Sequence, residues 1–475
     1  MKIMIRRYWE ASKPEKDTRQ LAAKQTQNCK NKKTGLLSRS VGIFMALTVF
    51  AVLGCNNTAI NEKLEGPVKV ELKKEANGYQ LFVEGDPFYI RGAGFEGPDP
   101  SSVAAHGGNA IRTWRTGDEH IGGQQILDEA YQNGLMVCMG IEIARERHGF
   151  DYDDPDAVQQ QFEDAKKEVL KYKDHPALLA WGIGNELNLH YSNKKVWDAV
   201  NDISLMIKSL DPNHLTTTML AGAGKEDVLA VIEQCPSLDF LSFQLYGNIV
   251  NLPQYIAESG YAGAYVVSEW GATGHWESPL TEWGRPIEQN SHEKAMAYKE
   301  RYEKVIAADT YHCLGSFVFL WGQKQERTPT WYGMFLESGD NTESVDVMQY
   351  LWTGSWPENR SPQLHSITMD GRTAHDHIYM TAGENFHAEV LASDPDNDPL
   401  TYHWEIIPEV PEHQQSDGGD FEPRPATVFT MDSDENAITI SAPLQKGDYR
   451  LFIYVFDGHN NAATANIPFY VNDRL

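Results

Sequence analysis

Eight short apolar segments alternate with polar or amphipathic stretches along much of this chain. They predict strands near residues 89–92, 110–113, 135–141, 178–183, 215–220, 240–245, 265–267 and 315–320. Helical periodicity predicts helices over 124–133, 157–172, 195–210, 293–308 and 345–352. Strands that are apolar on both faces and alternate with helices are typical of parallel sheets. Eight repeats over this length predict a (β/α)8 TIM barrel within residues 67–357.

A β-hairpin is expected directly before the barrel. Residues 69–72 and 79–83 alternate between apolar and polar side chains on either side of Asn77-Gly78, which is a strong turn signal. We expect this hairpin to close the bottom of the barrel.

Residues 361–475 follow a different pattern. Short alternating strands are separated by Asp, Gly, Asn and Pro, which predicts an all-β, immunoglobulin-like sandwich. Its run from Asp394 to Asp398 could supply oxygen ligands to calcium, but turn formers of this kind favour a plain turn. We expect a modest contact with the barrel and a structural role for this domain.

The N-terminal residues have the charge order of a secretory signal. Residues 1–40 hold eleven Lys or Arg against three acids, and the apolar run 41–53 is too short to span a bilayer. Val52-Leu53-Gly54-Cys55 resembles the lipobox of bacterial lipoproteins. The resemblance implies cleavage after 54, a lipid on Cys55, a tether over 56–66 and a place at the bacterial cell envelope. We expect the outer membrane, facing the periplasm or the exterior; an uncleaved anchor, or a signal cut elsewhere, is the alternative.

Charge restricts the partners of the mature chain. Removing residues 1–54 lowers the basic residues from 41 to 30 and the acidic ones from 67 to 64, which gives a net charge of −34. Such a surface repels phosphate backbones and disfavours nucleic acid, whereas a neutral glycan meets no such barrier. Cys138, Cys235 and Cys313 have neither CxxC spacing nor an even count, so we expect buried thiols without disulfides.

Two predicted strands end on a glutamate. The apolar run 178–183 leads to Asn185-Glu186, and the run 264–267 leads to Ser268-Glu269, 83 positions after Glu186. In a barrel of parallel strands all carboxyl ends open onto one face, so Glu186 and Glu269 can converge. Two converging carboxyls are the minimum machinery for cleaving a glycosidic bond.

These motifs resemble those of the clan A glycoside hydrolases, which are retaining enzymes on (β/α)8 barrels. The resemblance implies that Glu186 is the acid/base and Glu269 the nucleophile. With the hairpin and the C-terminal domain, the chain most resembles the bacterial family-158 endo-β-1,3-glucanases, although families 2 and 5 share the catalytic motifs. It implies β-glucan poly- and oligosaccharides as substrates, action on laminarin-like polymers, and no cofactor, because the carboxyls supply acid, base and nucleophile.

Other strand ends resemble the clan's supporting residues. Arg112 resembles the arginine beside the nucleophile, Tyr246 the tyrosine whose hydroxyl holds it, and Trp321 the tryptophan that floors the subsite of the cleaved sugar. Asn185 would bond the sugar 2-hydroxyl. Flat aromatic side chains and histidines in the loops are further candidates for sugar contacts, namely Trp114, His190, Trp270, Trp276, Trp331 and, beyond these, His275. No ligand-spaced pair predicts a metal site.

Several alternatives remain at this stage. The same catalytic pair would serve a β-mannanase, a β-galactosidase or a β-glucan transglycosylase. A non-catalytic, surface glycan-binding lipoprotein is the alternative from another class, although a pure binder has no need of two carboxyls with split pKa values. We expect a monomer.

Overall fold

The computed structural model describes residues 66–474, apart from 97–98, 118–120 and 417–420. The predicted signal segment, Cys55 and all but the last residue of the predicted tether lie outside the described residues. Among the residues that are described, no helix is both long enough and apolar enough to cross a membrane.

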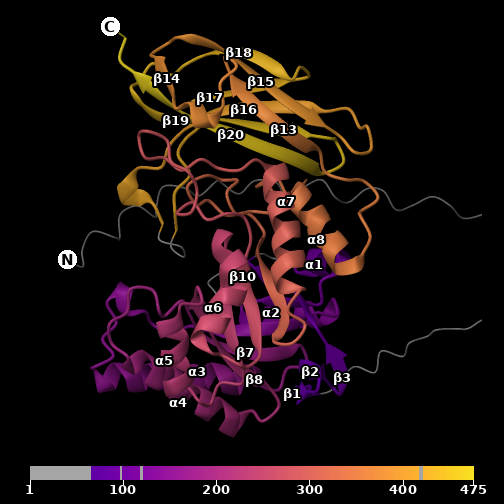
Figure 1. The fold of residues 1–475 in the computed structure, drawn as a ribbon, viewed down its shortest axis with the longest axis vertical. Helices are drawn as coiled ribbons and strands as arrows, with labels where there is room; N and C mark the ends of the chain where they lie inside the picture. Colours follow the sequence, from indigo (N-terminus) through magenta and orange to yellow (C-terminus); the bar gives the residue numbers. More distant parts are fainter. Residues whose placement is uncertain (1–65, 97–98, 118–120, 417–420, 475) are drawn as a thin grey trace, which may run out of the picture. The chain divides into compact units, whose positions relative to one another are not determined.

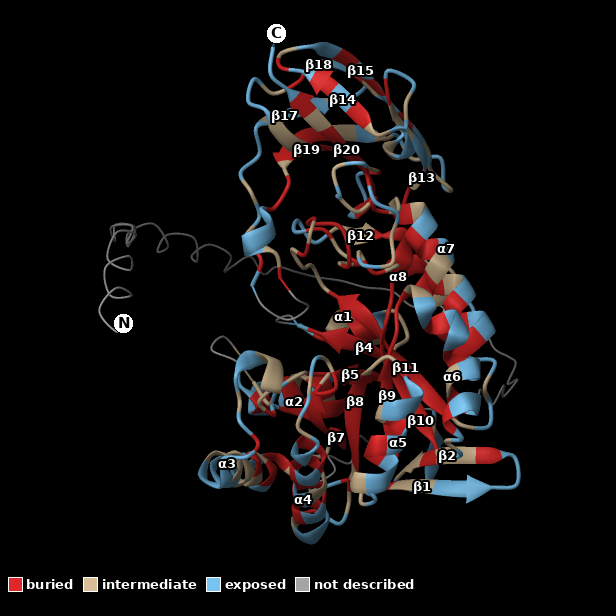
Figure 2. Cartoon of the chain, turned by 60° about the vertical axis from the view of Figure 1, so that its left-hand side comes forward, coloured by how far each residue is buried: buried red, intermediate tan, exposed pale blue. Residues whose placement is uncertain are grey.

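Eight parallel strands close into a barrel, as predicted (Figure 1). Each strand pairs with its neighbours in chain order, and β11 pairs with β4 to complete the ring. Side chains of these strands are buried almost throughout (Figure 2), as expected where helices cover the outer face of a parallel sheet. The strands are β4 (Ile90–Phe95), β5 (Ala110–Arg112), β6 (Met136–Ile141), β7 (Leu178–Asn185), β8 (Leu215–Ala221), β9 (Leu241–Gln244), β10 (Tyr265–Trp270) and β11 (Cys313–Trp321).

The helices are α1 (Ser101–Ala105), α2 (Gly123–Gln132), α3 (Pro155–Tyr172), α4 (Lys195–Leu210), α5 (Lys225–Gln234), α6 (Leu252–Ser259), α7 (Ser291–Arg301) and α8 (Glu343–Thr353). The five helices with predicted bounds, α2, α3, α4, α7 and α8, lie close to them. The sequence explains two of the starts. Asp154 caps α3 by accepting hydrogen bonds from the next turn, and Asn290 with Glu293 forms a capping box on α7. A π-helical turn, η3 (Tyr302–Ile306), continues α7 and accounts for its longer predicted range.

The hairpin closes the bottom of the barrel, as expected. It consists of β1 (Val70–Glu75), β2 (Gly78–Val83) and a short third strand, β3 (Asp86–Phe88). Val70 and Leu81 are buried against the lower ends of the barrel strands. The turn differs by one position from the prediction: Glu75 pairs with Gly78, so Gly78 is the first residue of β2. A side chain at Gly78 would lie 2.5 Å from the Tyr311 carbonyl oxygen, so close approach to the barrel also requires this glycine.

The C-terminal residues form two β-sheets around one apolar core, which confirms the predicted sandwich. The larger sheet has the order β12-β20-β19-β16-β17, with β14 on β20; the smaller is β13-β15-β18. The segment from Asp394 to Asp398 is a turn in which one Asp394 oxygen accepts from two backbone amides. The strands are β12 (Asn341–Thr342), β13 (Gln363–Met369), β14 (Ile378–Thr381), β15 (Asn385–Ser393), β16 (Thr401–Pro408), β17 (Phe429–Ser433), β18 (Ala437–Ser441), β19 (Gly447–Phe456) and β20 (Asn461–Asn472).

Buried polar residues and one strand pairing join the sandwich to the barrel. Strand β12 precedes α8 in the chain but pairs with β20 of the sandwich. Glu288, from the segment before α7, is buried and accepts hydrogen bonds from Lys294 and from Asn466 of β20. Arg450 of β19 is 1% exposed and donates to the Pro286 carbonyl. Buried polar groups paired across a boundary would lose their partners if the domains separated, so the interface belongs to one folded unit.

Cys138, Cys235 and Cys313 are buried free thiols, as predicted. Burial raises the pKa of each thiol, to about 11 for Cys138 and to about 12 for the other two. They act as small apolar side chains of the barrel.

Candidate active site

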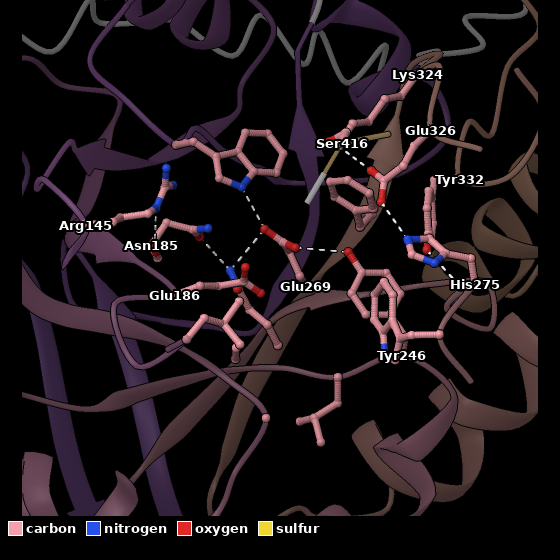
Figure 3. Close-up of a pocket in the computed structure, with 18 of the residues that line it drawn as sticks. Arg145, Asn185, Glu186, Tyr246, Glu269, His275, Lys324, Glu326, Tyr332 and Ser416 are labelled. Atoms are coloured by element: carbon pink, nitrogen blue, oxygen red, sulfur yellow. Dashed lines mark hydrogen bonds and ion pairs between the residues drawn. The ribbon is translucent and has the colours of Figure 1, made fainter. Parts of the chain in front are cut away.

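A pocket of about 870 Å³ opens at the carboxyl ends of the barrel strands. Its volume lies within the range of about 300–1,000 Å³ that is usual for ligand sites. Side chains from β7, β9, β10 and β11 form its base, and the loops that follow these strands form its sides. Glu186 and Glu269 both line it, and Figure 3 shows their side chains next to each other.

Glu269 is the second-last residue of β10, and both of its carboxyl oxygens accept hydrogen bonds. Oε1 accepts from the Arg112 guanidinium at 2.8 Å, from the Trp114 indole at 2.6 Å and from the Gln244 amide at 3.0 Å. Oε2 accepts from the Tyr246 hydroxyl at 3.0 Å. Only an ionised carboxylate accepts at every position, so this site fits the charged form of Glu269.

A second layer of hydrogen bonds fixes Asn185 beside this carboxylate. The Asn185 side-chain oxygen accepts from both Arg112 and Gln244, while Arg112 also donates to the Ser268 carbonyl at 3.0 Å. Arg112 and Gln244 are 1% and 3% exposed, so the packing around them restricts each side chain to one rotamer. With its oxygen engaged, the Asn185 amide directs its N–H groups at the pocket, where they can donate to a ligand oxygen.

Glu186 lies at the end of β7, where the backbone leaves the strand. Its φ of 53° is in the left-handed region, which is uncommon for residues other than glycine and which clusters at functional sites. Hydrogen bonds to the Glu186 backbone support this conformation: the Glu186 N–H donates to the Met219 carbonyl at 2.9 Å, and the Glu186 carbonyl accepts from the Arg147 guanidinium at 2.7 Å. The local geometry turns the carboxyl toward Glu269 instead of along the strand.

The surroundings of Glu186 favour its protonated form. Burial and, after it, the negative charge of Glu269 together raise the pKa of its carboxyl to about 7, against the opposing effect of Arg147, Arg112 and Arg145. Near neutral pH the pocket therefore holds one carboxyl that can donate a proton and one that only accepts hydrogen bonds.

Aromatic rings form one side of the pocket. Phe319 of β11 packs edge-on against Trp114, Tyr246 and Tyr332, with ring centroids 5.8 Å apart in each case. Trp276 packs against Tyr246 and is 59% exposed, which makes it the most accessible tryptophan at this site. Rings with free faces and edges suit the apolar C–H face of a sugar.

Loop residues add a charged cluster beside these rings. Glu326 is buried and pairs with Lys324 at 2.7 Å and with His275 at 3.3 Å (Figure 3). The His275 and Lys324 hydrogen bonds and charges lower the pKa of Glu326 despite its burial. Its neighbours thus keep Glu326 ionised and fix His275 at the pocket wall.

The structure brings most of the predicted site residues together. Glu186, Glu269, Asn185, Tyr246, Trp114 and Trp276 line the pocket, as does His275, and Arg112 lies beneath Glu269. Arg112 and Tyr246 contact Glu269 as the resemblance implied.

Trp321, His190, Trp270 and Trp331 are not among the residues that line the pocket, so the prediction of their positions was wrong. Trp321 packs against Trp352 and Phe335, and its indole donates to Ser102. The register between β11 and β4 shifts after Val318, so the expected alternation of faces fails before Trp321.

The other three have separate reasons. Trp270 follows Glu269 directly, and neighbouring side chains of a strand face opposite ways; it packs against Tyr298 and Tyr302. Trp331 is buried, and its indole donates to the Thr273 carbonyl. His190 is exposed beyond the pocket.

Sequence reasoning missed Gln244 and Phe319. Gln244 is two positions before Tyr246, and a polar residue inside an apolar strand run is a signal that would have identified it. Phe319 occupies the place on β11 that was assigned to Trp321. Lys324 and Glu326 lie in a loop without a repeating pattern, so no sequence signal marks them.

The pocket is separate from the one possible metal-binding group found in the described part of the chain. Asp394, Asp398 and Asp457 bring one oxygen each within 4.8 Å of one another, and all three belong to the sandwich.

Known proteins resemble parts of this chain. Residues 101–249 match the model of the glycosyl hydrolases family 2 TIM barrel domain. The matched segment runs from α1 through β9 and contains Asn185 and Glu186.

Curated relatives are similar over shorter stretches. A mannan endo-1,4-beta-mannosidase F of Aspergillus clavatus is 44% identical over 57 residues, which is 12% of this chain and 13% of the relative. A candidate mannan endo-1,4-beta-mannosidase of Arabidopsis thaliana is 30% identical over 119 residues, 23% of this chain and 26% of the relative. The chain thus matches about a quarter of the length of such relatives, or less.

Among solved structures, a Bacteroides uniformis beta-glucuronidase has a TM-score of 0.47 at 13% identity, with 85% of this chain and 48% of that chain covered. An endo-1,4-beta-mannanase from Eisenia fetida has a TM-score of 0.40 at 13% identity, with 60% and 96% covered. These values bear on neither substrate nor mechanism.

Proposed function

We propose that this protein is a retaining glycoside hydrolase that cleaves a neutral β-linked glycan. The observation that carries the proposal is the pair of carboxyls with opposite surroundings: Glu269 held by four donors, and Glu186 with a pKa raised to about 7. Double displacement needs an ionised nucleophile and a protonated acid in one site, and a binding protein needs neither.

In the first step, a carboxylate oxygen of Glu269 attacks the anomeric carbon while Glu186 gives its proton to the departing oxygen. Oε2 is the better placed oxygen, because it has one donor where Oε1 has three. The products are a glycosyl ester on Glu269 and a free alcohol. In the second step, Glu186 takes a proton from water, the water oxygen bonds to the anomeric carbon, and the ester bond breaks.

Asn185 supports the transition state of both steps. Arg112 and Gln244 hold its amide oxygen in place, so its N–H groups already point into the pocket before a substrate binds. A hydrogen bond from such a group to the sugar 2-hydroxyl strengthens as positive charge develops at the anomeric carbon.

For the substrate we propose a β-1,3-glucan cleaved within the chain. This rests on the resemblance of the motifs and domain order to the family-158 endo-β-1,3-glucanases, and the accessible Trp276 in a pocket of this volume suits a chain of several sugars. A β-mannan is the second candidate, favoured by the names of the curated relatives.

One experiment addresses both reaction and substrate. Purified protein is incubated with laminarin, β-mannan and β-1,4-glucan, and reducing ends are measured over time. We expect new reducing ends, and 1H NMR of the first product should show the β anomer before mutarotation. An α anomer at early times would contradict retention. No product from any glycan, with folded protein, would favour the glycan-binding alternative.

We also propose that Cys55 is lipidated and holds the enzyme at the bacterial cell envelope, as the Val52-Leu53-Gly54-Cys55 motif suggests. Metabolic labelling with a fatty-acid analogue should label the wild type and leave Cys55→Ala unlabelled. Label that persists in Cys55→Ala would exclude this cysteine as the site.

A further inference from the structure

The pocket wall contains residues from outside the barrel. Glu412, Gln415 and Ser416 follow β16 of the sandwich and line the pocket together with barrel residues. Ser416 is buried, Gln415 is half-buried and Glu412 is exposed. The sandwich therefore contributes part of the surface that a ligand in the pocket meets.

Contacts on both sides hold this wall segment, to the barrel after it and within the sandwich before it. After it in the chain, Glu422 is 2% exposed and accepts from the Arg327 guanidinium at 2.8 Å, from the Gln325 amide at 3.3 Å and from the Ser416 N–H at 2.8 Å. Arg327 itself lines the pocket.

Before the segment, Glu409 pairs with Arg450 at 2.7 Å, and the Val410 carbonyl accepts from Gln415 at 3.1 Å. Val410 is 1% exposed. A segment anchored in this way is preorganised, so binding to it costs little ordering entropy.

The charges of the wall fit hydroxyl groups better than a carboxylate. Lys324 pairs with Glu326, and Arg327 pairs with Glu422. Glu412 carries a negative charge on the same wall. A neutral sugar offers O–H donors to a carboxylate and to an amide oxygen, whereas the charge of an acidic sugar would be repelled by Glu412.

We propose that Glu412 and Gln415 form a subsite for a neutral sugar unit at least one position away from the cleaved bond. The inference rests on the proposed glycosidase function and assigns to the sandwich a direct part in substrate recognition. Its contribution increases with the length of the bound chain, because only longer substrates reach from the two glutamates to the wall.

The test compares chain lengths. The full-length wild type first defines the shortest and the longest soluble oligosaccharide that it cleaves, within the series of the polymer on which it is active. The ratio of kcat/KM for the longest to that for the shortest is then measured for the double variant Glu412→Gln, Gln415→Ala. We expect this ratio to fall about tenfold, as the loss of two hydrogen bonds predicts, mainly through KM on the longest substrate.

Gln414→Ala is the matched control. Gln414 lies on the same segment, is exposed and does not line the pocket, so its variant should keep the wild-type ratio. An unchanged ratio in the double variant, or equal losses on both lengths, would overturn the subsite. A lower Tm of the double variant with an unchanged kcat/KM ratio would show that the two residues stabilise the fold without binding substrate.

The outcome separates the two proposals. A wild type that cleaves no oligosaccharide contradicts the proposed function itself. An active wild type with an insensitive double variant contradicts the subsite alone. A preference of the wild type for polymers of acidic sugars over neutral ones would overturn the assignment of sugar class.

Discussion

The ends of β7 and β10 carry the same side chain in opposite surroundings. At β10 the side chain of Glu269 is 5% exposed and accepts from one guanidinium, one indole, one amide and one hydroxyl. At β7 the backbone turns into the left-handed region at Glu186, and within the described residues no hydrogen bond reaches its carboxyl oxygens. Both carboxyls line one pocket.

The difference shows how one residue type can be fitted for two roles. Donors stabilise the charged form of a carboxyl, whereas burial without donors and a nearby negative charge stabilise the neutral form. Glu269 has the first environment and Glu186 the second. The four predictions below test this contrast, from the largest expected effect to the smallest.

Replacing the proposed nucleophile should have the largest effect. Glu269→Gln keeps the size of the side chain but removes the attacking oxygen charge, so we expect a loss of at least about 10⁴-fold in kcat. Activity on the cognate oligosaccharide, with circular dichroism to check folding, measures it. More than a few per cent of wild-type rate in folded protein would assign the nucleophile to another residue.

Removing the proposed acid, Glu186, should lower the rate less, and the loss should depend on the leaving group. Glu186→Ala loses proton donation, a contribution of about 10²–10⁴-fold. An aryl glycoside with a nitrophenol leaving group needs little protonation, so its cleavage to the glycosyl enzyme should be largely restored. Equal losses on activated and natural substrates would contradict the acid role of Glu186.

Some residues of the site could be predicted from the local sequence pattern, and others could not. The two glutamates could be predicted because each lies at the carboxyl end of a buried parallel strand, and all such ends meet on one face. Trp321 could not be placed, since a register shift after Val318 depends on pairing with β4. The wall residue Glu412 was missed for a related reason: it reaches the pocket only through the packing of the sandwich on the barrel.

Removing one donor from Glu269 should give a smaller effect. Gln244→Met keeps the side-chain volume but removes the amide that donates to both Glu269 and Asn185. A hydrogen bond to a charged group contributes about 1.5–3 kcal/mol, so kcat/KM should fall roughly 10- to 100-fold.

Thr217→Val is the control for this variant. Thr217 shares a buried hydrogen bond with Ser242 on the neighbouring strand, and it does not line the pocket. Its loss should lower Tm and leave kcat/KM unchanged. Equal kinetic effects in the two variants would mean that Gln244 acts on the barrel and not on the carboxylate.

The smallest expected effect is a shift in the pKa of Glu186 when Glu269 is replaced. Because Glu186 must be protonated to act as acid and its pKa is raised to about 7, kcat/KM should fall as the pH rises through about 7. The charge of Glu269 is the second cause of that raised pKa, after burial, so the pKa of Glu186 should be lower in Glu269→Gln. Since that variant is expected to be inactive, the titration is followed by 13C NMR of labelled glutamate, with Glu186→Gln to assign the signal. An unchanged Glu186 titration in Glu269→Gln would show that burial alone raises its pKa, and that the two strand ends are electrostatically independent.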